Sequence, residues 1–288
     1  MTPLTVGQLY DRAVLHGGDR IALSYGERHV TYRELGELAG RVSAGLAAQG
    51  LGRGDRVAFL MANCAEYVAC EYAVARLGAT RVPLAVQLAD DDHVYMLNFA
   101  RCSTLVYHEK LAARVAGLQA RLPGVRVYVC VGEDPARVPP GHLHLQALAA
   151  AGHPPVPAVD VSPEDIAGIY FTGGTTGRPK GVTLSHRSWF HTYYVEMLEF
   201  GIGVHETFVF CTPMTHASGC LILPVLLRQG RCVVLDRFDP ELLLETIARE
   251  RATATLLVPT MIYMLLEHAD GARHDTRSLR NVLYGAAA

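Results

Sequence analysis

Short buried-strand patterns alternate with amphipathic helical patterns along most of this 288-residue chain, and this alternation constrains the fold more than any other feature. Thr31 and Glu34 have the spacing of a capping box, which opens a helix whose apolar residues recur at three- and four-residue steps up to Leu46. A buried strand over 56–60 follows, and Asn63 can cap the next helix. The sequence therefore predicts an α/β fold of mainly parallel sheets with flanking helices, in two similar layered lobes.

Composition divides the chain into three segments. Residues 133–165 hold seven of the 15 prolines and interrupt the alternation. We expect a first α/β lobe over 1–132, a Pro-rich connecting segment over 133–165, and a second α/β lobe over 166–288. Further strands are expected near 103–107, 125–131, 207–211, 231–236, 254–258 and 281–284.

Overall composition excludes several classes of protein. Half of the residues are hydrophobic and 19% are charged, so a packed core is expected rather than disorder. A net charge of −2 argues against nucleic-acid binding. The first residues do not have the pattern of a signal peptide, and the most apolar run, 217–227, is too short to span a bilayer. The seven cysteines form no CxxC pair, so we interpret them as reduced core residues of a cytoplasmic protein.

Residues 171–182, FTGGTTGRPKGV, form a glycine- and threonine-rich loop with one lysine. Glycines allow backbone N–H groups to converge on an anion, the threonines add hydroxyl donors, and Lys180 adds a positive charge. Pro179 precedes the lysine and Gly181 follows it, so no helix is expected to begin there, unlike in the common P-loop. The pattern favours a polyphosphate-binding loop, and the alternative is a flexible linker with a solvated lysine.

This loop resembles the phosphate loop of the adenylate-forming acyl-CoA synthetase superfamily, with Gly173 where that family usually has serine. Further similar positions lie in the family's order at 31–35, 54–57, 63, 66 and 77–79, so the resemblance covers nearly all of the chain. It implies the fold of the N-terminal domain of these enzymes. It also implies that the ATP β- and γ-phosphates are bound by seven residues of the loop: Thr172, Gly173, Gly174, Thr175, Thr176, Gly177 and Lys180. It implies that Mg²⁺ is held through these phosphates, with Thr176 as its candidate protein contact.

A second motif, residues 212–219, resembles the family's Pro-x-x-His-x-x-Gly segment. The resemblance implies that His216 borders the reacting carboxylate and the acyl pocket together with Ala217, Ser218 and Gly219, and that His216 and Lys180 are the catalytic residues. The alternative is a histidine that caps the next helix. Thr215 stands where the acyl-CoA members normally have an aromatic residue. Because residues 211–227 contain no acidic side chain, an α-amino acid substrate is disfavoured, and the apolar run 217–227 favours a fatty or aromatic acid.

The last residues, 281–288, resemble the strand and small-residue turn that lies against the adenine. Gly285, Ala286 and Ala287 are the candidates for this contact, since small side chains permit close approach to a flat ring. A plain strand end is the alternative.

The resemblance implies ATP-dependent activation of a carboxylic acid as an acyl adenylate, followed by thioester formation with coenzyme A. The family's metal-binding glutamate, its ribose-binding aspartate and its C-terminal domain are not found in these 288 residues. We therefore expect a truncated N-terminal domain that is poorly active alone and whose open sheet edges favour oligomers. Transfer to a carrier-protein thiol, and a non-catalytic regulator that binds nucleotide or acyl groups, remain alternatives. The acid, the acceptor thiol and the oligomeric state are left open.

Overall fold

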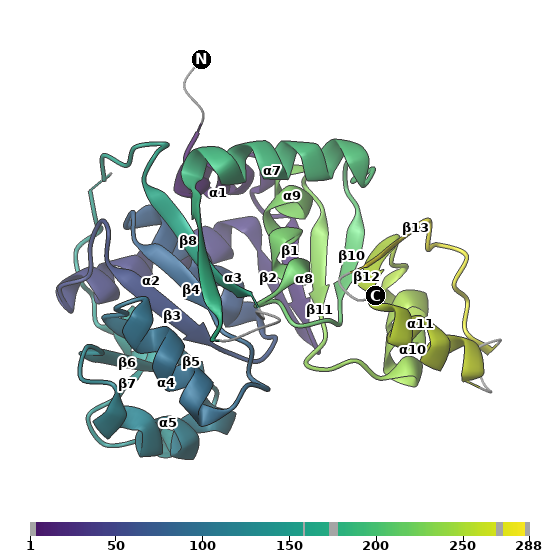
Figure 1. Ribbon diagram of the computed structural model, residues 1–288. Coiled ribbons are helices and arrows are strands. Elements are labelled where there is room, and N and C mark those ends of the chain that lie inside the picture. The colour runs from purple at the N-terminus through teal and green to yellow at the C-terminus, as the bar shows by residue number, and fades with distance from the viewer. Residues whose placement is uncertain (1–3, 158, 173–177, 269–272, 286–288) are drawn as a thin grey trace. The chain divides into compact units, whose positions relative to one another are not determined.

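The computed structural model describes residues 4–157, 159–172, 178–268 and 273–285 (Figure 1). The chain forms two compact units, and each contains its own mainly parallel sheet. The first unit comprises Met1–Gln8, Gly36–Ala62 and Glu66–Phe190, and the second comprises Leu9–Leu35, Asn63–Ala65 and His191–Ala288. The predicted α/β class with mainly parallel sheets is confirmed.

The sheet of the first unit has the strand order β7-β6-β5-β3-β4-β8-β9. Its strands are β3 (Arg56–Leu60), β4 (Thr80–Pro83), β5 (Thr104–His108), β6 (Val127–Val131), β7 (Leu143–His144), β8 (Ile166–Thr172) and β9 (Lys180–Ser185). All neighbours are parallel except β8 and β9, which form an antiparallel hairpin. Strands β4 and β5 are buried along their whole length, as expected for parallel strands covered on both faces.

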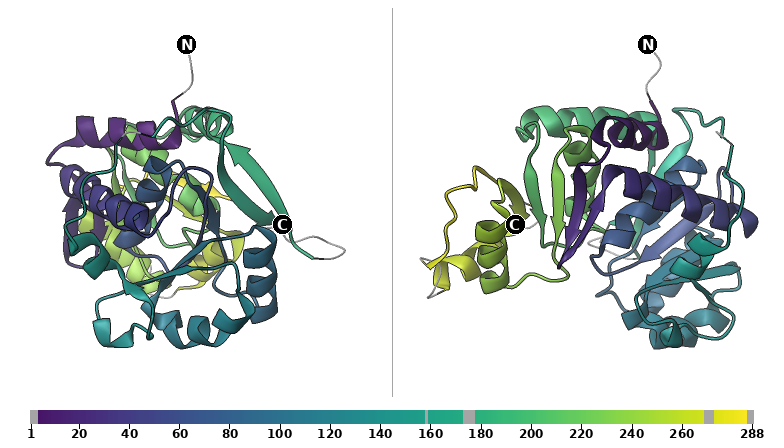
Figure 2. Two further views of the ribbon diagram at one scale, coloured as in Figure 1. Left: turned by 90° about the vertical axis from the view of Figure 1, so that its left-hand side faces the viewer. Right: turned by 180° about the vertical axis from the view of Figure 1, so that it is seen from behind.

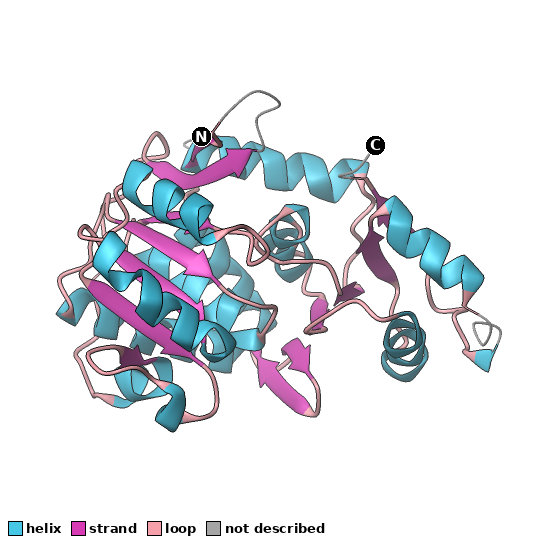
Figure 3. Ribbon diagram, turned by 60° about the horizontal axis from the view of Figure 1, so that its bottom comes forward, coloured by secondary structure: helices cyan, strands magenta, loops and turns pink. Residues whose placement is uncertain are grey.

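Helices cover both faces of this sheet (Figure 3). The helices of the chain up to Glu199, of which α1, α2, α3 and α7 extend into the second unit, are α1 (Val6–Gly17), α2 (Tyr32–Ala48), α3 (Ala65–Arg76), α4 (Asp90–Phe99), α5 (Ala112–Leu118), α6 (Leu145–Ala150) and α7 (His186–Glu199). Short 3₁₀ turns occupy Glu109–Leu111, Gln119–Arg121 and Pro135–Arg137. One face of the sheet packs against α4 and α5 through a buried cluster that includes Ala58, Leu60, Val82, Met96, Leu97, Leu105, Tyr107, Val115 and Leu118.

The sheet of the second unit has the strand order β13-β12-β10-β11-β1-β2. Its strands are β1 (Ile21–Tyr25), β2 (Arg28–Thr31), β10 (Thr207–Phe210), β11 (Arg231–Val234), β12 (Ala254–Leu257) and β13 (Asn281–Tyr284). The remaining helices are α8 (Ala217–Cys220), α9 (Ile222–Leu227), α10 (Pro240–Glu250) and α11 (Pro259–Glu267). Among the described strands of this second sheet, only β1 and β2 pair in antiparallel fashion, and β1 runs parallel beside β11 (Figure 2). A cluster that includes Val209, Val233, Leu243, Ile247 and Leu257 forms its core.

Two helices, α2 and α7, begin with side-chain capping hydrogen bonds. The Glu34 backbone N–H donates to Thr31 Oγ1 at 3.1 Å and the Thr31 N–H donates to Glu34 Oε2 at 2.7 Å, which is the predicted capping box. At the start of α7, the Ser188 N–H donates to Ser185 Oγ at 3.2 Å. Both helices therefore begin with side-chain acceptors for their first N–H groups.

Each sheet contains strands from both of the lobes expected from the sequence. Strands β8 and β9, which lie within the predicted second lobe at 166–288, complete the first sheet beside β4. Strands β1 and β2, within the predicted lobe 1–132, join the second sheet through β11. Parallel strands that pair by hydrogen bonds can lie far apart in the sequence, so composition along the chain does not reveal which strands share a sheet. The division of the sequence into segments 1–132, 133–165 and 166–288 stays a prediction.

The cysteines are free thiols, and six of the seven are buried. Burial raises the pKa of the Cys102 thiol to about 12 and that of the Cys211 thiol to about 11, which disfavours the reactive thiolate. These side chains therefore belong to the cores. No helix within the described ranges is both long and apolar enough to cross a bilayer.

Candidate active site

The β8–β9 hairpin brings together the two ends of the glycine-rich loop. Thr172, the last residue of β8, lies directly opposite Lys180, the first residue of β9. Directly opposed residues of an antiparallel pair project to the same face, so the hydroxyl and the ammonium group share one face of the hairpin. Both side chains are exposed. The other predicted phosphate contacts, Gly173, Gly174, Thr175, Thr176 and Gly177, lie outside the described residues.

The position of this loop in the first sheet is favourable for an anionic ligand. It follows the carboxyl end of β8, which is parallel to its neighbour β4, and ligands of α/β proteins bind outside such strand ends. As the sequence predicts, no helix begins at Lys180, and the structure shows that this residue begins strand β9. The loop is therefore a strand-to-strand connection, unlike the strand-to-helix P-loop.

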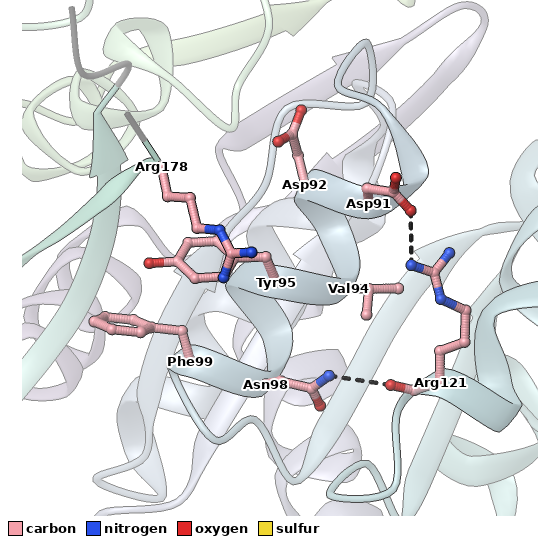
Figure 4. Close-up of a pocket in the computed structure, with 8 residues that line it drawn as sticks. All are labelled: Asp91, Asp92, Val94, Tyr95, Asn98, Phe99, Arg121 and Arg178. Carbon is pink, nitrogen blue, oxygen red and sulfur yellow. Dashed lines mark hydrogen bonds and ion pairs between the residues drawn. The ribbon is translucent and has the colours of Figure 1, made fainter. Parts of the chain in front are cut away.

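One flank of the loop rests on α4. The Arg178 guanidinium lies 5.1 Å from the centroid of the Tyr95 ring, and Phe99 packs edge-on against Phe171 of β8 with 6.2 Å between centroids. Figure 4 shows Arg178, Tyr95 and Phe99 on one side of a surface pocket of about 520 Å³, with the Asp91–Arg121 ion pair on the other side. Tyr95 and Phe99 lie one helical turn apart on α4, and this spacing is the sequence signal that could have indicated the contact.

A buried charged network lies beneath β8. The Arg81 Nη1 atom is 2.6 Å from Glu71 Oε1, and both side chains are almost fully buried. Arg81 Nε donates to the Tyr170 hydroxyl at 2.5 Å, and its guanidinium carbon is 4.8 Å from the centroid of the Trp189 ring. Through these contacts Arg81 ties β8 to α3 and to the first turn of α7. Sequence reasoning did not find this network, although an arginine within an otherwise apolar strand pattern was a usable signal.

In the second unit, residues 212–219 connect β10 to α8. His216 occupies the N-cap position of α8, but its side chain makes no capping hydrogen bond. This observation argues against the alternative in which the histidine serves only as a helix cap. The other three predicted pocket residues are Ala217, which is exposed, and Ser218 and Gly219, which are buried.

The environment of the His216 ring favours the neutral imidazole. The His216 side chain is exposed, but partial loss of hydration lowers the pKa of its ring below the usual value, which favours the uncharged form. Its Nδ1 atom is hydrogen-bonded to Thr215 Oγ1 at 3.1 Å. The Nε2 atom is therefore the ring nitrogen that can meet a ligand. Thr215, at the position of the family's aromatic residue, supplies a contact that the sequence did not predict.

Gly219 allows an unusually close backbone approach within this segment. A Cβ atom at this position would lie 1.9 Å from the Met214 carbonyl oxygen, so no larger side chain fits without movement. The Gly219 N–H donates to the His216 carbonyl at 2.9 Å. Gly219 thus helps to fix the turn that carries His216.

Gly285 follows β13 at the same sheet edge as the His216 segment. The order β13-β12-β10 places one strand between them, and both segments follow the carboxyl ends of their strands. A Cβ atom on Gly285 would meet no described atom within 4 Å, so packing in the described ranges does not require glycine there. Ala286 and Ala287 lie outside the described residues.

Comparison with known proteins gives consistent matches over nearly the whole chain. The model of the family described as "AMP-binding enzyme" matches residues 10–288. A medium/long-chain-fatty-acid–CoA ligase (FadD8) of Mycobacterium tuberculosis is 31% identical over 290 residues, covering 100% of this chain and 51% of that protein. A feruloyl-CoA synthase of an Amycolatopsis species is 32% identical and covers 92% of this chain and 51% of that protein.

Among solved structures, a long-chain-fatty-acid–CoA ligase (FadD1) of Archaeoglobus fulgidus superposes with a TM-score of 0.90 at 26% identity, covering 99% of this chain and 58% of that one. The chain spans about half the length of the curated relatives it matches.

Proposed function

The chain belongs to the AMP-binding enzyme family, and from this premise we propose that its protein uses ATP to activate a hydrophobic carboxylic acid as an acyl adenylate. The acyl group then passes to the thiol of coenzyme A. The names of the relatives, a fatty-acid–CoA ligase and a feruloyl-CoA synthase, support a fatty or aromatic acid as the substrate class. The absence of acidic side chains from residues 211–227 also supports an acid without an ammonium group.

The opposition of Thr172 and Lys180 across the base of the glycine-rich loop carries this proposal. An anionic carboxylate must approach a polyphosphate, so catalysis depends on positioning and on neutralisation of charge. Lys180 supplies a mobile ammonium group, and Thr172 supplies a hydroxyl donor beside it. We assign both to the β- and γ-phosphates, together with the loop residues 173–177.

In the first step, one carboxylate oxygen bonds to the α-phosphorus while the bond to the bridging oxygen breaks and pyrophosphate leaves. The neutral His216 ring can donate a hydrogen bond from Nε2 to the carboxylate and orient it. In the second step, the thiolate sulfur of coenzyme A bonds to the acyl carbon and AMP leaves. Gly285 is proposed to border the adenine, since nothing described fills the space above its Cα.

Mg²⁺ belongs to the same proposal. It would neutralise the phosphates, with Thr176 as its candidate protein contact, and polarise the phosphorus that the carboxylate attacks. A cytoplasmic location, expected from the reduced cysteines, is likewise part of the proposal.

The test is pyrophosphate release with ATP, Mg²⁺ and a pool of fatty and aromatic acids, with hydroxylamine present to trap an acyl adenylate as its hydroxamate. Both the 288-residue chain and the complete product of its gene should be assayed, since the chain alone is expected to be poorly active. Acid-dependent release and a trapped hydroxamate support the proposal, and the hydroxamate identifies the acid. Absence of acid-dependent release from both proteins would overturn it. Replacing coenzyme A by a carrier-protein thiol identifies the acceptor.

A further inference from the structure

Asn63 is a buried polar residue of the second unit. Helix α3 begins at Ala65, and the Asn63 amide makes three hydrogen bonds to loop backbone. Its Nδ2 group donates to the Thr212 carbonyl at 2.9 Å and to the Leu235 carbonyl at 3.0 Å. Its Oδ1 atom accepts from the Met214 N–H at 2.8 Å. Both donor hydrogens and the acceptor are thus satisfied by backbone groups.

These three contacts lie at the carboxyl ends of two neighbouring strands. Thr212 follows β10 and Leu235 follows β11, and these strands are parallel neighbours in the second sheet. One amide therefore joins two strand ends that would otherwise diverge into separate loops. Because buried backbone groups need partners, the amide also replaces the hydrogen bonds that the strands no longer supply beyond their last residues.

From Met214 the constraint passes directly to His216. The Met214 carbonyl packs against the Cα of Gly219, where no side chain fits, and the His216 N–H donates to the Pro213 carbonyl at 3.1 Å. The Gly219 N–H in turn donates to the His216 carbonyl. The His216 backbone is thus bonded to Pro213, which lies between the two residues of this segment that Asn63 contacts, Thr212 and Met214.

We propose that Asn63 is a positioning residue for the acid substrate: it holds residues 212–219, and through them the His216 ring, in the orientation that meets the carboxylate. The claim about the substrate rests on the proposed function. The claim about the His216 ring concerns only contacts within the second unit and can be tested separately.

The test replaces Asn63 by aspartate. Asn63→Asp keeps the size of the side chain and the acceptor for the Met214 N–H, but it turns an oxygen toward the Thr212 and Leu235 carbonyls. Asn98→Asp is the matched control, since the Asn98 Nδ2 group donates to the Arg121 carbonyl at 3.0 Å on the exposed side of α4 in the first unit. Both variants remove an amide donor from a backbone carbonyl, but only Asn63 contacts the segment that carries His216.

Two readouts are measured on the wild type and both variants. The first is the ¹⁵N-histidine spectrum of the 288-residue chain, in which the His216 signals are identified by their loss in His216→Gln. We expect Asn63→Asp to shift the His216 ring signals and leave those of His142 in the first unit unchanged. The second is acid-dependent ATP–pyrophosphate exchange by the complete gene product. We expect a rise of at least tenfold in KM for the acid, with KM for ATP within twofold of wild type.

The outcomes separate the two claims. Unchanged His216 signals and an unchanged acid KM in Asn63→Asp would overturn the positioning role. Shifted His216 signals without acid-dependent exchange in any protein, wild type included, would support the positioning of the ring and contradict the proposed function. An equal rise in KM for acid and ATP would indicate general loosening and would also overturn the proposal. If Asn63→Asp does not fold, Asn63→Ser, which introduces no charge, is measured by the same readouts.

Discussion

The phosphate-loop hairpin of the first unit and the histidine segment of the second are held in place by different means. In the hairpin, the residues proposed to bind ATP, Thr172 and Lys180, are exposed, while the buried Arg81 network beneath β8 provides the anchoring. In residues 212–219, Asn63 and Gly219 hold Met214, which lies only two residues from His216. In the hairpin, substitutions of the exposed residues should therefore weaken ATP binding without lowering the free energy of unfolding. In residues 212–219, a substitution that weakens acid binding should also lower the free energy of unfolding.

The largest effect on stability is expected from Arg81→Met. This change removes one partner of a buried ion pair and leaves the Glu71 carboxylate without its nearest positive charge. Loss of one partner of such a pair costs about 3–5 kcal/mol of unfolding free energy, measurable by urea denaturation. Tyr170→Phe removes only the hydroxyl that Arg81 Nε contacts and should cost about 1 kcal/mol. Equal costs for the two variants would show that the buried ion pair does not anchor the hairpin.

The next effect is a loss of stability in acid caused by His186, the first residue of α7. Its Nδ1 atom accepts from the Val6 N–H at 3.1 Å, and burial lowers the pKa of His186 to about 4. The unfolded chain, with an ordinary histidine pKa of about 6.5, binds the proton first, so the free energy of unfolding should fall as pH drops from about 6.5 to 4. The decrease should reach about 3 kcal/mol.

His186→Asn, which can retain an acceptor for the Val6 N–H, should flatten this pH dependence. The control is His153→Asn at an exposed position, which should leave it intact. An undiminished acid slope in His186→Asn would mean that another group causes it. Urea denaturation at half-unit pH steps makes this comparison.

A smaller effect distinguishes two glycines of the second unit. Gly219→Ala places a Cβ atom against the Met214 carbonyl oxygen and should lower the unfolding free energy by about 1–3 kcal/mol, as overpacking does. Gly285→Ala meets no described atom within 4 Å and should change it by less than about 0.5 kcal/mol. The same denaturation measurement applies to both. A larger loss in Gly285→Ala than in Gly219→Ala would reverse the assignment of scaffold and ligand-facing roles.

Sequence reasoning predicted the features whose physical causes are local. The capping box at Thr31 and Glu34 involves residues three apart, and the lack of a helix start at Lys180 follows from its neighbours Pro179 and Gly181. Parallel α/β architecture likewise followed from the alternation of periodic patterns. Each of these signals lies within a short window of the chain.

The features that sequence reasoning missed depend on distant residues. The addition of β8 and β9 to the first sheet, and of β1 and β2 to the second, is decided by pairing between residues far apart in the chain, such as Arg81 with Gly168 and Leu23 with Cys232. Asn63 illustrates the same limit within the site. Its residue type and its place shortly before a helix are those of a helix cap, but its hydrogen-bond partners lie about 150 residues further along the chain.

The central claim, that the hairpin loop binds ATP through Lys180, is tested most directly by calorimetric titration of the chain with ATP and Mg²⁺. The sequence contains two lysines, so Lys110→Ala in the Glu109–Leu111 turn is the natural control for Lys180→Ala. We predict at least tenfold weaker binding, about 1.4 kcal/mol, for Lys180→Ala, with the unfolding free energy changed by less than about 0.5 kcal/mol. Lys110→Ala should bind as the wild type does. Equal affinities of the two variants for ATP would contradict the account.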